Sequence, residues 1–535
     1  MSRNVGLSVL LFAAALIALW PAPAVAEDDV GFKSIFDGKT LIGWDGDPQH
    51  WHVEDGAITG EATKAQALKA NTFIIWRQGE VDDFELKAEF KMAGGNSGIQ
   101  YRSFEEPKAG RWVVGGYQAD MDADDQWTGG LYGERYRGVL AAPGQKTIIG
   151  ENHEPKVVGQ LADRAALNSI IRKGDWNEYH IVARGNHLLQ ELNGRLVTDV
   201  TDEDTAMRRR GGIVALQLHA GFDMKVQFRN IRLKRLPMQD CKKVVFIAGP
   251  PSHDYAAHEY YAGCTLLAKA LNNNLPSVYA TVYRNGWPAD PTAFDNANAI
   301  VVYADGDDGN LLLSHHDELD ALARKGVGLG CLHYSLKVPK GKAGDAMLAW
   351  IGGYFETLWS VSPFWTARFE RFPEHPITRG VKPFAVEDEW YYHMRFAKDM
   401  AGVTPILTAV PPDETRRGPD GARSGDAAVR ERLGSPEVVA WAYDRAAAGG
   451  AGRGFGFTGG HVHWNWANDN YRKVVLNAVV WIAGAEVPRE GVSSKTPTLE
   501  DLQANQDKPQ PKGFDLDAVR KRLQSWGQTP ATAPR

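Results

Sequence analysis

The chain has 535 residues, of which 43% are hydrophobic and 24% are charged, and its formal net charge is −6. At roughly 150 residues per domain, this length predicts two to four domains with sizeable cores. No run of basic residues is longer than three, as at 208–210, whereas phosphate binding needs a concentrated basic face. The composition therefore argues against nucleic acid as a partner.

The cysteines Cys241, Cys264 and Cys331 are too few for a disulfide scaffold in a chain of this length. An odd number leaves at least one free thiol, and the sequence does not show which two, if any, pair. The alternative is that all three are small buried hydrophobic residues.

Residues 1–26 are predicted to be a signal peptide. Arg3 supplies a positive start, residues 9–20 are largely apolar, and 24–26 read Ala-Val-Ala, a small-x-small cleavage pattern. An uncleaved membrane anchor is the alternative, but the apolar stretch is short for a membrane span and acidic residues follow it. We expect cleavage near Ala26, and hence a periplasmic or secreted protein with no membrane span in the mature chain.

Residues 31–236 show the period-two alternation of half-buried strands. In 83–92 every even position is apolar and every odd position is charged. Asn193 and Gly194 favour a type I′ hairpin turn, and the change of parity near Arg229 and Asn230 predicts a bulge. An antiparallel β-sandwich of jelly-roll type is expected.

Residues 241–485 show a different pattern, in which buried strands at 243–249, 299–303 and 327–332 alternate with helices. Helices are predicted at 258–271, after Ser314 as N-cap, and at 471–482, where the apolar residues follow helical spacing. This alternation predicts an α/β domain with a parallel sheet. Residues 486–535 are expected to form a polar, extended tail with a short helix from Leu516 to Trp526.

The first half contains five motifs, at 36–44, 95–102, 176–179, 212–219 and 228–231. Together they resemble the 3-keto-disaccharide hydrolase family, a concanavalin-like jelly roll. The resemblance implies chemistry in which a ketone at C3 of a sugar acidifies the hydrogen at C2. A base then removes that proton, the glycosidic oxygen leaves from C1, and water adds later.

Such a site needs a base and donors or a metal for the enolate oxygen. Strand alternation places Gln118 with Asp120 on one face, and Gln217 with His219 on one face. We expect Arg102 to hold sugar oxygens or the enolate, and His219 or Asp120 to act as base or metal ligand. The candidate substrate-binding residues are Asn96, Tyr101, Trp112 and Trp127.

Each of these assignments has a structural alternative. Arg102 could be a surface ion-pair partner, and Gln217 and His219 could be satisfied core or rim residues. Asp120 could belong, with Asp122, Asp124 and Asp125, to a solvated or calcium-binding loop. Either tryptophan could simply pack in the core.

The second half resembles the ThuA-like (trehalose-utilisation) domain, similar in fold to class I glutamine amidotransferases, through segments at 252–254, 328–333, 387–391, 452–455 and 458–461. An amidotransferase needs a cysteine nucleophile at a strand-to-helix elbow. Here His333 takes that position and Cys331 lies two residues earlier, inside the strand. Glutaminase chemistry is therefore not expected.

His253, His333, Glu389 and His461 all lie at loop ends after predicted strands, where open parallel sheets bind ligands. We expect them to form a sugar or metal site, although some could be structural or exposed. The cofactor stays open, with a divalent metal ion as a candidate.

The sequence therefore favours an exported carbohydrate-catabolic hydrolase that cleaves 3-keto-glycosides, with a second domain that acts on or binds a related sugar. The main alternative is a non-catalytic carbohydrate-binding jelly roll that targets an α/β partner domain to glycans. A third is an interaction protein that kept two enzyme folds without their chemistry. The expected partner is a small-molecule sugar; no protein partner is indicated.

Overall fold

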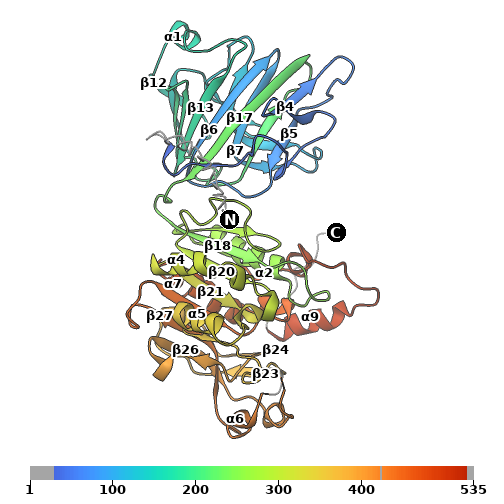
Figure 1. Cartoon of the computed structure of the whole chain (residues 1–535), viewed down its shortest axis with the longest axis vertical. Coiled ribbons are helices and arrows are strands. Elements are labelled where there is room, and N and C mark those ends of the chain that lie inside the picture. Colours follow the sequence, from blue (N-terminus) through green and yellow to red (C-terminus); the bar gives the residue numbers. More distant parts are fainter. Residues whose placement is uncertain (1–28, 422–424, 527–535) are drawn as a thin grey trace, which may run out of the picture. The chain divides into compact units, whose positions relative to one another are not determined.

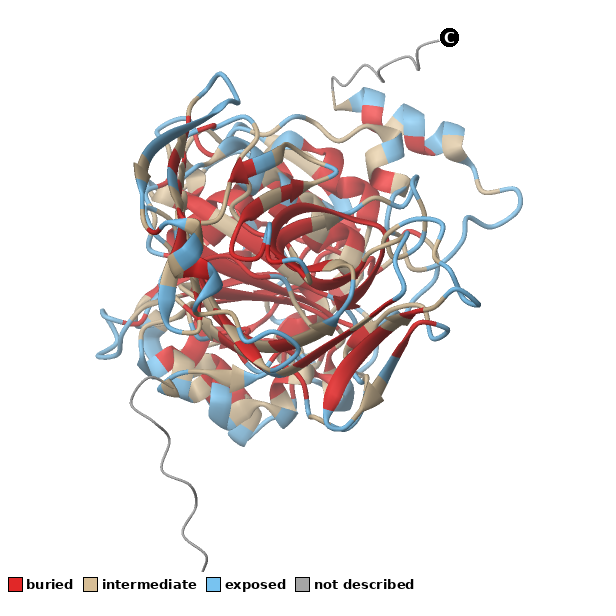
Figure 2. Cartoon of the chain, turned by 90° about the horizontal axis from the view of Figure 1, so that it is seen from above, coloured by how far each residue is buried: buried red, intermediate tan, exposed pale blue. Residues whose placement is uncertain are grey.

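The computed structural model describes residues 29–421 and 425–526, so the predicted signal peptide lies outside the described residues. Within these ranges, no helix combines the length and the apolar character needed to cross a bilayer. Buried residues follow the strands and the inner helices, whereas most exposed residues lie in loops (Figure 2).

The first half folds into two sheets. Strands β6, β13 and β17 run side by side in the larger sheet (Figure 1). This ten-stranded sheet has the order β12 (Pro155–Gln160), β11 (Gln145–Ile149), β15 (Arg195–Asp202), β14 (His187–Leu192), β13 (Asn177–Arg184), β6 (Phe84–Ala93), β17 (Met224–Arg235), β4 (Ala57–Ala62) and β3 (Trp51–Glu54), with β1 (Lys33–Ser34) beside β17.

The second sheet of this half has seven strands. Their order is β10 (Gly138–Ala141), β9 (Leu131–Glu134), β8 (Val114–Asp122), β7 (Asn96–Glu105), β16 (Ile213–Leu218), β5 (Thr72–Trp76) and β2 (Trp44–Asp45). Inward side chains of both sheets form one core, which includes Leu86 of β6 and Ile99 of β7. The predicted antiparallel β-sandwich is confirmed, apart from one parallel pair, β11 with β15.

Three local predictions for this half are confirmed. The apolar residues of 84–90 at alternate positions all enter the core. Asn193 and Gly194 both have positive φ, at 49° and 78°, and join β14 to β15. The register of β17 against β6 shifts between Arg229 and Arg232, and Asn230 at φ 49° lies in this bulge.

The second half contains a seven-stranded sheet, with the order β19 (Val278–Tyr283), β18 (Lys242–Ala248), β20 (Ala299–Tyr303), β21 (Gly328–Leu332), β28 (Arg453–Phe457), β27 (Glu437–Asp444) and β26 (Val403–Ala409). The strands from β19 to β28 are parallel, as predicted. β27 is antiparallel to both of its neighbours, β28 and β26, so the sheet is mixed.

Helices cover both faces of this sheet. Successive residues of the buried strand β18 point to opposite faces and therefore enter two different cores. Val244 and Phe246 pack with helices α2 (Tyr260–Asn274) and α7 (Asp469–Ile482). Val245 and Ile247 pack with α4 (His316–Arg324) and α5 (Lys342–Ile351) on the other side. A separate hairpin is formed by β23 (Phe364–Phe369) and β24 (Phe384–Glu389).

Two predictions for this half need correction. Ser314 ends a short helix, α3 (Leu311–Ser314), and α4 starts after His315, so Ser314 is not an N-cap. The segment after Pro488 is not simply extended, because α8 (Leu499–Gln503) and α9 (Leu516–Ser525) pack Leu502, Val519 and Leu523 into the core. The helix that begins at Leu516 was itself predicted.

Candidate functional site

In the first half, the outer face of the seven-stranded sheet of the sandwich carries a row of polar side chains. In β8, Tyr117, Ala119 and Met121 enter the sandwich core. Gln118 and Asp120 therefore lie on the opposite face, as strand alternation predicts. In the neighbouring strand β7, Asn96 is paired with Asp122 and Gly98 with Asp120.

Asp120 is the central carboxyl group of this face and is only 7% exposed. Its Oδ1 atom accepts hydrogen bonds from Asn96 Nδ2 at 3.1 Å, Gln118 Nε2 at 3.3 Å and the backbone N–H of Met121 at 3.0 Å. Burial raises the pKa of Asp120 to about 7 despite these donors, and the nearby Asp122 adds to the rise. The carboxyl therefore titrates near neutral pH.

A row of amides orients the donor that Asp120 receives from Gln118. Ser103 Oγ donates to Gln100 Oε1 at 2.8 Å, and Gln100 Nε2 donates to Gln118 Oε1 at 2.6 Å. Gly98 makes room for this row, because a Cβ atom there would lie 2.4 Å from the Gln118 side chain. The nitrogen of Gln118 is thereby fixed toward Asp120.

A cavity of about 600 Å³ opens over this face, and we call it the sandwich cleft. Glu134 of β9 lies in it, accepting hydrogen bonds from Asn71 Nδ2 at 3.4 Å and Gln217 Nε2 at 3.3 Å. Burial raises the pKa of Glu134. The residues that line the cleft and are used below are Asn71, Asn96, Gln118, Asp120, Trp127, Tyr132, Glu134 and His219.

His219 and Trp127 complete the cleft. His219 Nδ1 lies 2.7 Å from the carbonyl oxygen of Ala220, which only accepts, so Nδ1 carries a proton and Nε2 is left as an acceptor in the neutral ring. Trp127 is 42% exposed, which leaves its ring available for stacking against a sugar.

Arg102 is not brought to the cleft. The pairing of β7 with β8 shifts between Tyr101 and Phe104, and Arg102 adopts a positive φ of 46° in this bulge. Its guanidinium group is 1% exposed, pairs with Asp83 at 2.7 Å and donates to the carbonyl oxygens of Asp82 and Gly185. The expectation that Arg102 holds sugar oxygens or an enolate is corrected, because this group is enclosed by protein.

Two of the four candidate substrate-binding residues also lie elsewhere. Tyr101 is fully buried in the core between the sheets, where its hydroxyl accepts from Gln190. Trp112 donates from Nε1 to Asp45 at 2.9 Å and is not among the residues that line the cleft. Asn96 and Trp127 are the two that reach it.

The acidic run after Asp120 forms a loop. Asp122 accepts backbone N–H groups from Gln126, Trp127 and Thr128, at 2.8 to 3.0 Å. Asp125 pairs with Lys173 at 2.7 Å. These bonds account for both carboxylates without a calcium ion, whereas Asp120 faces the cleft.

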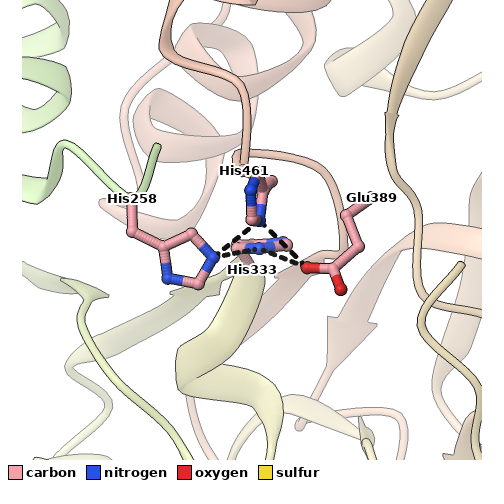
Figure 3. A group of neighbouring side chains, drawn as sticks. All are labelled: His258, His333, Glu389 and His461. Carbon is pink, nitrogen blue, oxygen red and sulfur yellow. Dashed lines mark hydrogen bonds and ion pairs between the residues drawn. The ribbon is translucent and has the colours of Figure 1, made fainter. Parts of the chain in front are cut away.

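In the second half, four side chains meet at the carboxyl ends of the parallel strands, and we call them the histidine cluster. They are His258, after β18; His333, directly after β21; His461, after β28; and Glu389, at the end of β24. The donor atoms that they offer all lie within 4.8 Å of one another (Figure 3). This is where an open α/β sheet binds ligands.

The cluster differs by one residue from the set predicted from sequence. His333, Glu389 and His461 converge as expected, whereas His253 lies beside the cluster, with its ring 3.7 Å from that of His258 and its Nδ1 bonded to Ser252 Oγ. His258 takes the fourth place. It precedes helix α2 in a loop where Ala256 and His258 both have positive φ, and no pattern in the sequence marks it as a ligand.

Electrostatics within the cluster favour a neutral His258 and a charged Glu389. Burial, with a smaller contribution from the neighbouring histidines, lowers the pKa of His258 to about 3. Burial alone would raise the pKa of Glu389, but its contacts with the His333 and His461 rings outweigh burial and hold the pKa well below its usual range. The cluster therefore presents imidazole nitrogens and one anionic oxygen.

His333 occupies the elbow predicted for it, with a left-handed φ of 54°. Cys331 lies inside β21 and is buried, and burial raises the pKa of its thiol to about 12. A buried thiol that stays protonated is not an activated nucleophile. Cys241, Cys264 and Cys331 are all free thiols in the structure.

Fold and sites together define a chain in which a β-sandwich with a polar cleft precedes an α/β domain with a candidate metal centre. Residues 31–234 match the 3-keto-alpha-glucoside-1,2-lyase-like domain, and residues 252–482 match the trehalose utilisation (ThuA) domain. The chain therefore joins a domain that matches the first family to a domain that matches the second. These matches point to a carbohydrate-active protein.

A curated relative is the 3-keto-disaccharide hydrolase of Bacteroides thetaiotaomicron, which is 29% identical over 174 residues, covering 29% of this chain and 53% of the relative. The chain thus spans about half the length of that protein. A Parabacteroides distasonis structure described as a glycosyl hydrolase shows 19% identity and a TM-score of 0.27, covering 38% of this chain and 99% of its own. A ThuA-like protein from Bacteroides uniformis shows 14% identity and a TM-score of 0.34, covering 45% and 91%.

Proposed function

We propose that the β-sandwich cleaves 3-keto-glycosides in the sandwich cleft, by removal of the C2 proton, elimination and hydration. The observation that carries the proposal is a buried carboxyl, Asp120, whose pKa of about 7 matches the requirement of a general base near neutral pH. The match to the 3-keto-alpha-glucoside-1,2-lyase-like domain and the sugar named for the Bacteroides relative support this substrate class.

The first half-reaction is an elimination. Asp120 takes the C2 proton, whose acidity comes from delocalisation of the carbanion onto the C3 oxygen. The electron pair then forms the C1–C2 double bond, and the C1–oxygen bond breaks. Glu134, whose pKa is also raised, supplies a proton to the departing oxygen.

Water restores the two carboxyl groups in the second half-reaction. The Glu134 carboxylate accepts a proton as water oxygen bonds to C1, and protonated Asp120 returns a proton to C2. The sum is hydrolysis with both side chains regenerated, so no external oxidant or reductant is needed.

The remaining cleft residues bind and orient. Burial raises the pKa of Tyr132, so its hydroxyl keeps its proton and serves as a donor to the enolate oxygen in place of Arg102. Asn96 and Gln118 hold the Asp120 carboxylate, and Trp127 offers a stacking surface. Neutral donors suit this site, because a buried cation would lower the pKa of Asp120.

The proposal extends to the rest of the chain. The predicted signal peptide supports action in the periplasm or outside the cell. The ThuA domain is proposed to act on or bind a related sugar, a proposal supported by its family match and by ligand-type side chains at its sheet edge.

The test uses the full chain with a 3-keto-disaccharide in D₂O and measures both free sugar release and deuterium at C2 of the product. The acidic proton on Asp120 exchanges with solvent before it is returned, so elimination followed by hydration predicts release with one deuteron incorporated at C2. Asp120→Asn should lose turnover, whereas Asp223→Asn, which changes an exposed aspartate outside the cleft, should keep it. Release without deuterium would contradict the mechanism, and tight binding without turnover would favour the carbohydrate-binding alternative.

A further inference from the structure

The hydrogen bonds around the histidine cluster fix the ring proton of His333. His333 Nδ1 lies 2.8 Å from the carbonyl oxygen of Thr458, which can only accept. The proton is therefore on Nδ1, and the lone pair of Nε2 points into the cluster.

The same reasoning applies to His258. The Tyr260 hydroxyl donates its proton to Asp305 Oδ1 at 2.6 Å. Its oxygen must then accept from His258 Nδ1, which lies 2.8 Å away. His258 Nε2 is thus also unprotonated, yet it lies only 3.0 Å from His333 Nε2. Two lone pairs face each other across this distance.

The other two groups do not resolve this conflict. His461 Nδ1 lies 2.8 Å from His258 Nε2 and 3.0 Å from Glu389 Oε2. A single proton on His461 Nδ1 can serve one of these neighbours. The Tyr391 hydroxyl lies 3.2 Å from His333 Nε2 and 3.4 Å from Glu389 Oε2 and can donate to one of these two atoms. Neither proton lies between the two Nε2 atoms, which therefore stay opposed. Both histidines of that pair are buried, so an additional proton there is costly. A cation between the four atoms satisfies all of them together.

We propose that the ThuA domain binds one divalent transition-metal ion through His258 Nε2, His333 Nε2, His461 Nδ1 and Glu389 Oε2. Three imidazole nitrogens and one carboxylate oxygen suit Mn²⁺, Fe²⁺, Co²⁺, Ni²⁺ or Zn²⁺, whereas Mg²⁺ and Ca²⁺ prefer oxygen ligands. The site is independent of the sandwich cleft, because its ligands all come from the second half of the chain.

The residues around the ligands behave as outer-shell partners. Thr458 and Tyr260 each accept the second ring N–H of a ligating histidine, which is the usual way in which such a ring is held. His258 and His333 both keep left-handed backbone conformations, with φ of 53° and 54°, and such strain is concentrated at functional sites.

A neighbouring group of His253, His258 and Asp305 also has donor atoms close together. There, however, the hydroxyls of Ser252 and Tyr260 donate to Asp305, at 2.8 and 2.6 Å, and Ser252 Oγ bonds to His253. Each of these short contacts is thus an ordinary hydrogen bond with its own proton, and none needs a metal ion. The structure therefore assigns one ion to this edge of the sheet rather than two.

The proposed ion is accessible to small molecules. The side chains of His461 and Glu389 are 18% and 11% exposed, whereas His333 is fully buried. Four protein ligands leave further positions on a five- or six-coordinate ion for water or an oxygen of a bound sugar. A resident ion of this kind would act as a Lewis acid toward such an oxygen.

The experiment strips the full-length protein with a chelator and titrates it separately with CoCl₂, MnCl₂ and ZnCl₂, using MgCl₂ as comparison. Bound metal is counted by elemental analysis, and the visible spectrum of the Co²⁺ form reports its ligands. We expect one ion per chain and at least about tenfold weaker binding in His461→Gln and Glu389→Gln. His316→Gln, which changes a histidine on α4 outside the cluster, should bind as wild type.

Folding of each variant is checked by circular dichroism. If a variant does not fold, X-ray absorption on the Co²⁺ form of the wild type decides, and nitrogen and oxygen neighbours at about 2.0–2.2 Å are expected. The proposal is overturned if the wild type binds none of the three transition metals, binds Mg²⁺ as tightly, or keeps its affinity in both ligand variants. Sugar release by the sandwich is measured separately, so failure of one proposal is not failure of the other.

Discussion

The sandwich cleft and the histidine cluster gather polar side chains by different routes. In the cleft, the groups stand on one face of neighbouring antiparallel strands, and neutral amides supply the hydrogen bonds that Asp120 accepts. In the cluster, they come from separate segments after parallel strands and from the end of a hairpin strand, and His258 Nε2 and His333 Nε2 oppose each other. In the cleft, a donor proton faces each lone pair of Asp120 Oδ1 that is used, which suits proton transfer. In the histidine cluster, no proton lies between the two opposed Nε2 atoms, which suits a cation.

The largest expected effect concerns the cleft. Asp120→Asn should lower the rate of sugar release by roughly 10²- to 10⁴-fold, the usual contribution of a general base. In the wild type Asp120 is active when deprotonated, so the rate should rise with pH through an acid limb near pH 7, and it should fall again where Glu134 loses the proton that it donates. Initial rates between pH 5 and 9 check this. If the rate instead reaches half of its maximum near pH 4, the ordinary pKa of a carboxyl group, the role of Asp120 is contradicted.

The next effect concerns Arg102, which the structure places in a buried ion pair. Arg102→Met leaves Asp83 without its partner and should lower the free energy of unfolding by about 3–5 kcal/mol. Urea unfolding measures the change. Arg111→Met, at a side chain 75% exposed, should have little effect. A folded, fully stable Arg102→Met that has lost only turnover would restore the catalytic assignment.

A smaller effect concerns stability: Asp120→Asn should raise the free energy of unfolding, whereas substituting a buried charged residue usually lowers it. The folded-state pKa of Asp120 lies above its unfolded value, so stability is lost as pH rises from about 4 to 7 and stays lower beyond. Asp120→Asn removes this cost and should gain roughly 1–3 kcal/mol at pH 8 and nothing near pH 4. Thermal unfolding at the two pH values tests it, and an equal change at both would show that ionisation is not involved.

The smallest effect concerns the cluster. Tyr260→Phe removes the hydroxyl that accepts from His258 Nδ1 and should weaken Co²⁺ binding about tenfold, with the fold retained. Tyr261→Phe changes the neighbouring, half-buried tyrosine and provides the control. Unchanged affinity in Tyr260→Phe would mean that this hydroxyl does not position the ring.

Strand periodicity was enough to predict the sandwich and the placement of Gln118 and Asp120, because alternation acts over the nine residues of β8. The same rule failed at Arg102, since a bulge and a positive φ redirect that side chain. Glu134 was missed because β9 has four residues, too few for a clear pattern.

For the α/β domain, the sequence was enough to predict the strands and which side chains follow their carboxyl ends. His333, Glu389 and His461 could be assigned to one edge of the sheet, since they follow or end recognisable strands. His258 could not, because a loop with left-handed residues carries it there, and only tertiary structure brings it to His333. Strand β27, which is antiparallel to β26 and β28, likewise has no local signature that separates it from a parallel strand.

The row from Ser103 through Gln100 and Gln118 to Asp120 has a direction, since each link passes a hydrogen from donor to acceptor toward the carboxylate. An isosteric exchange such as Gln118→Glu would change almost no volume, yet it would set one anion against another and leave Gln100 as its sole amide neighbour in the row. Hydrogen-bonding polarity at these positions therefore matters more than size, and a side chain that preserves only bulk would break the row.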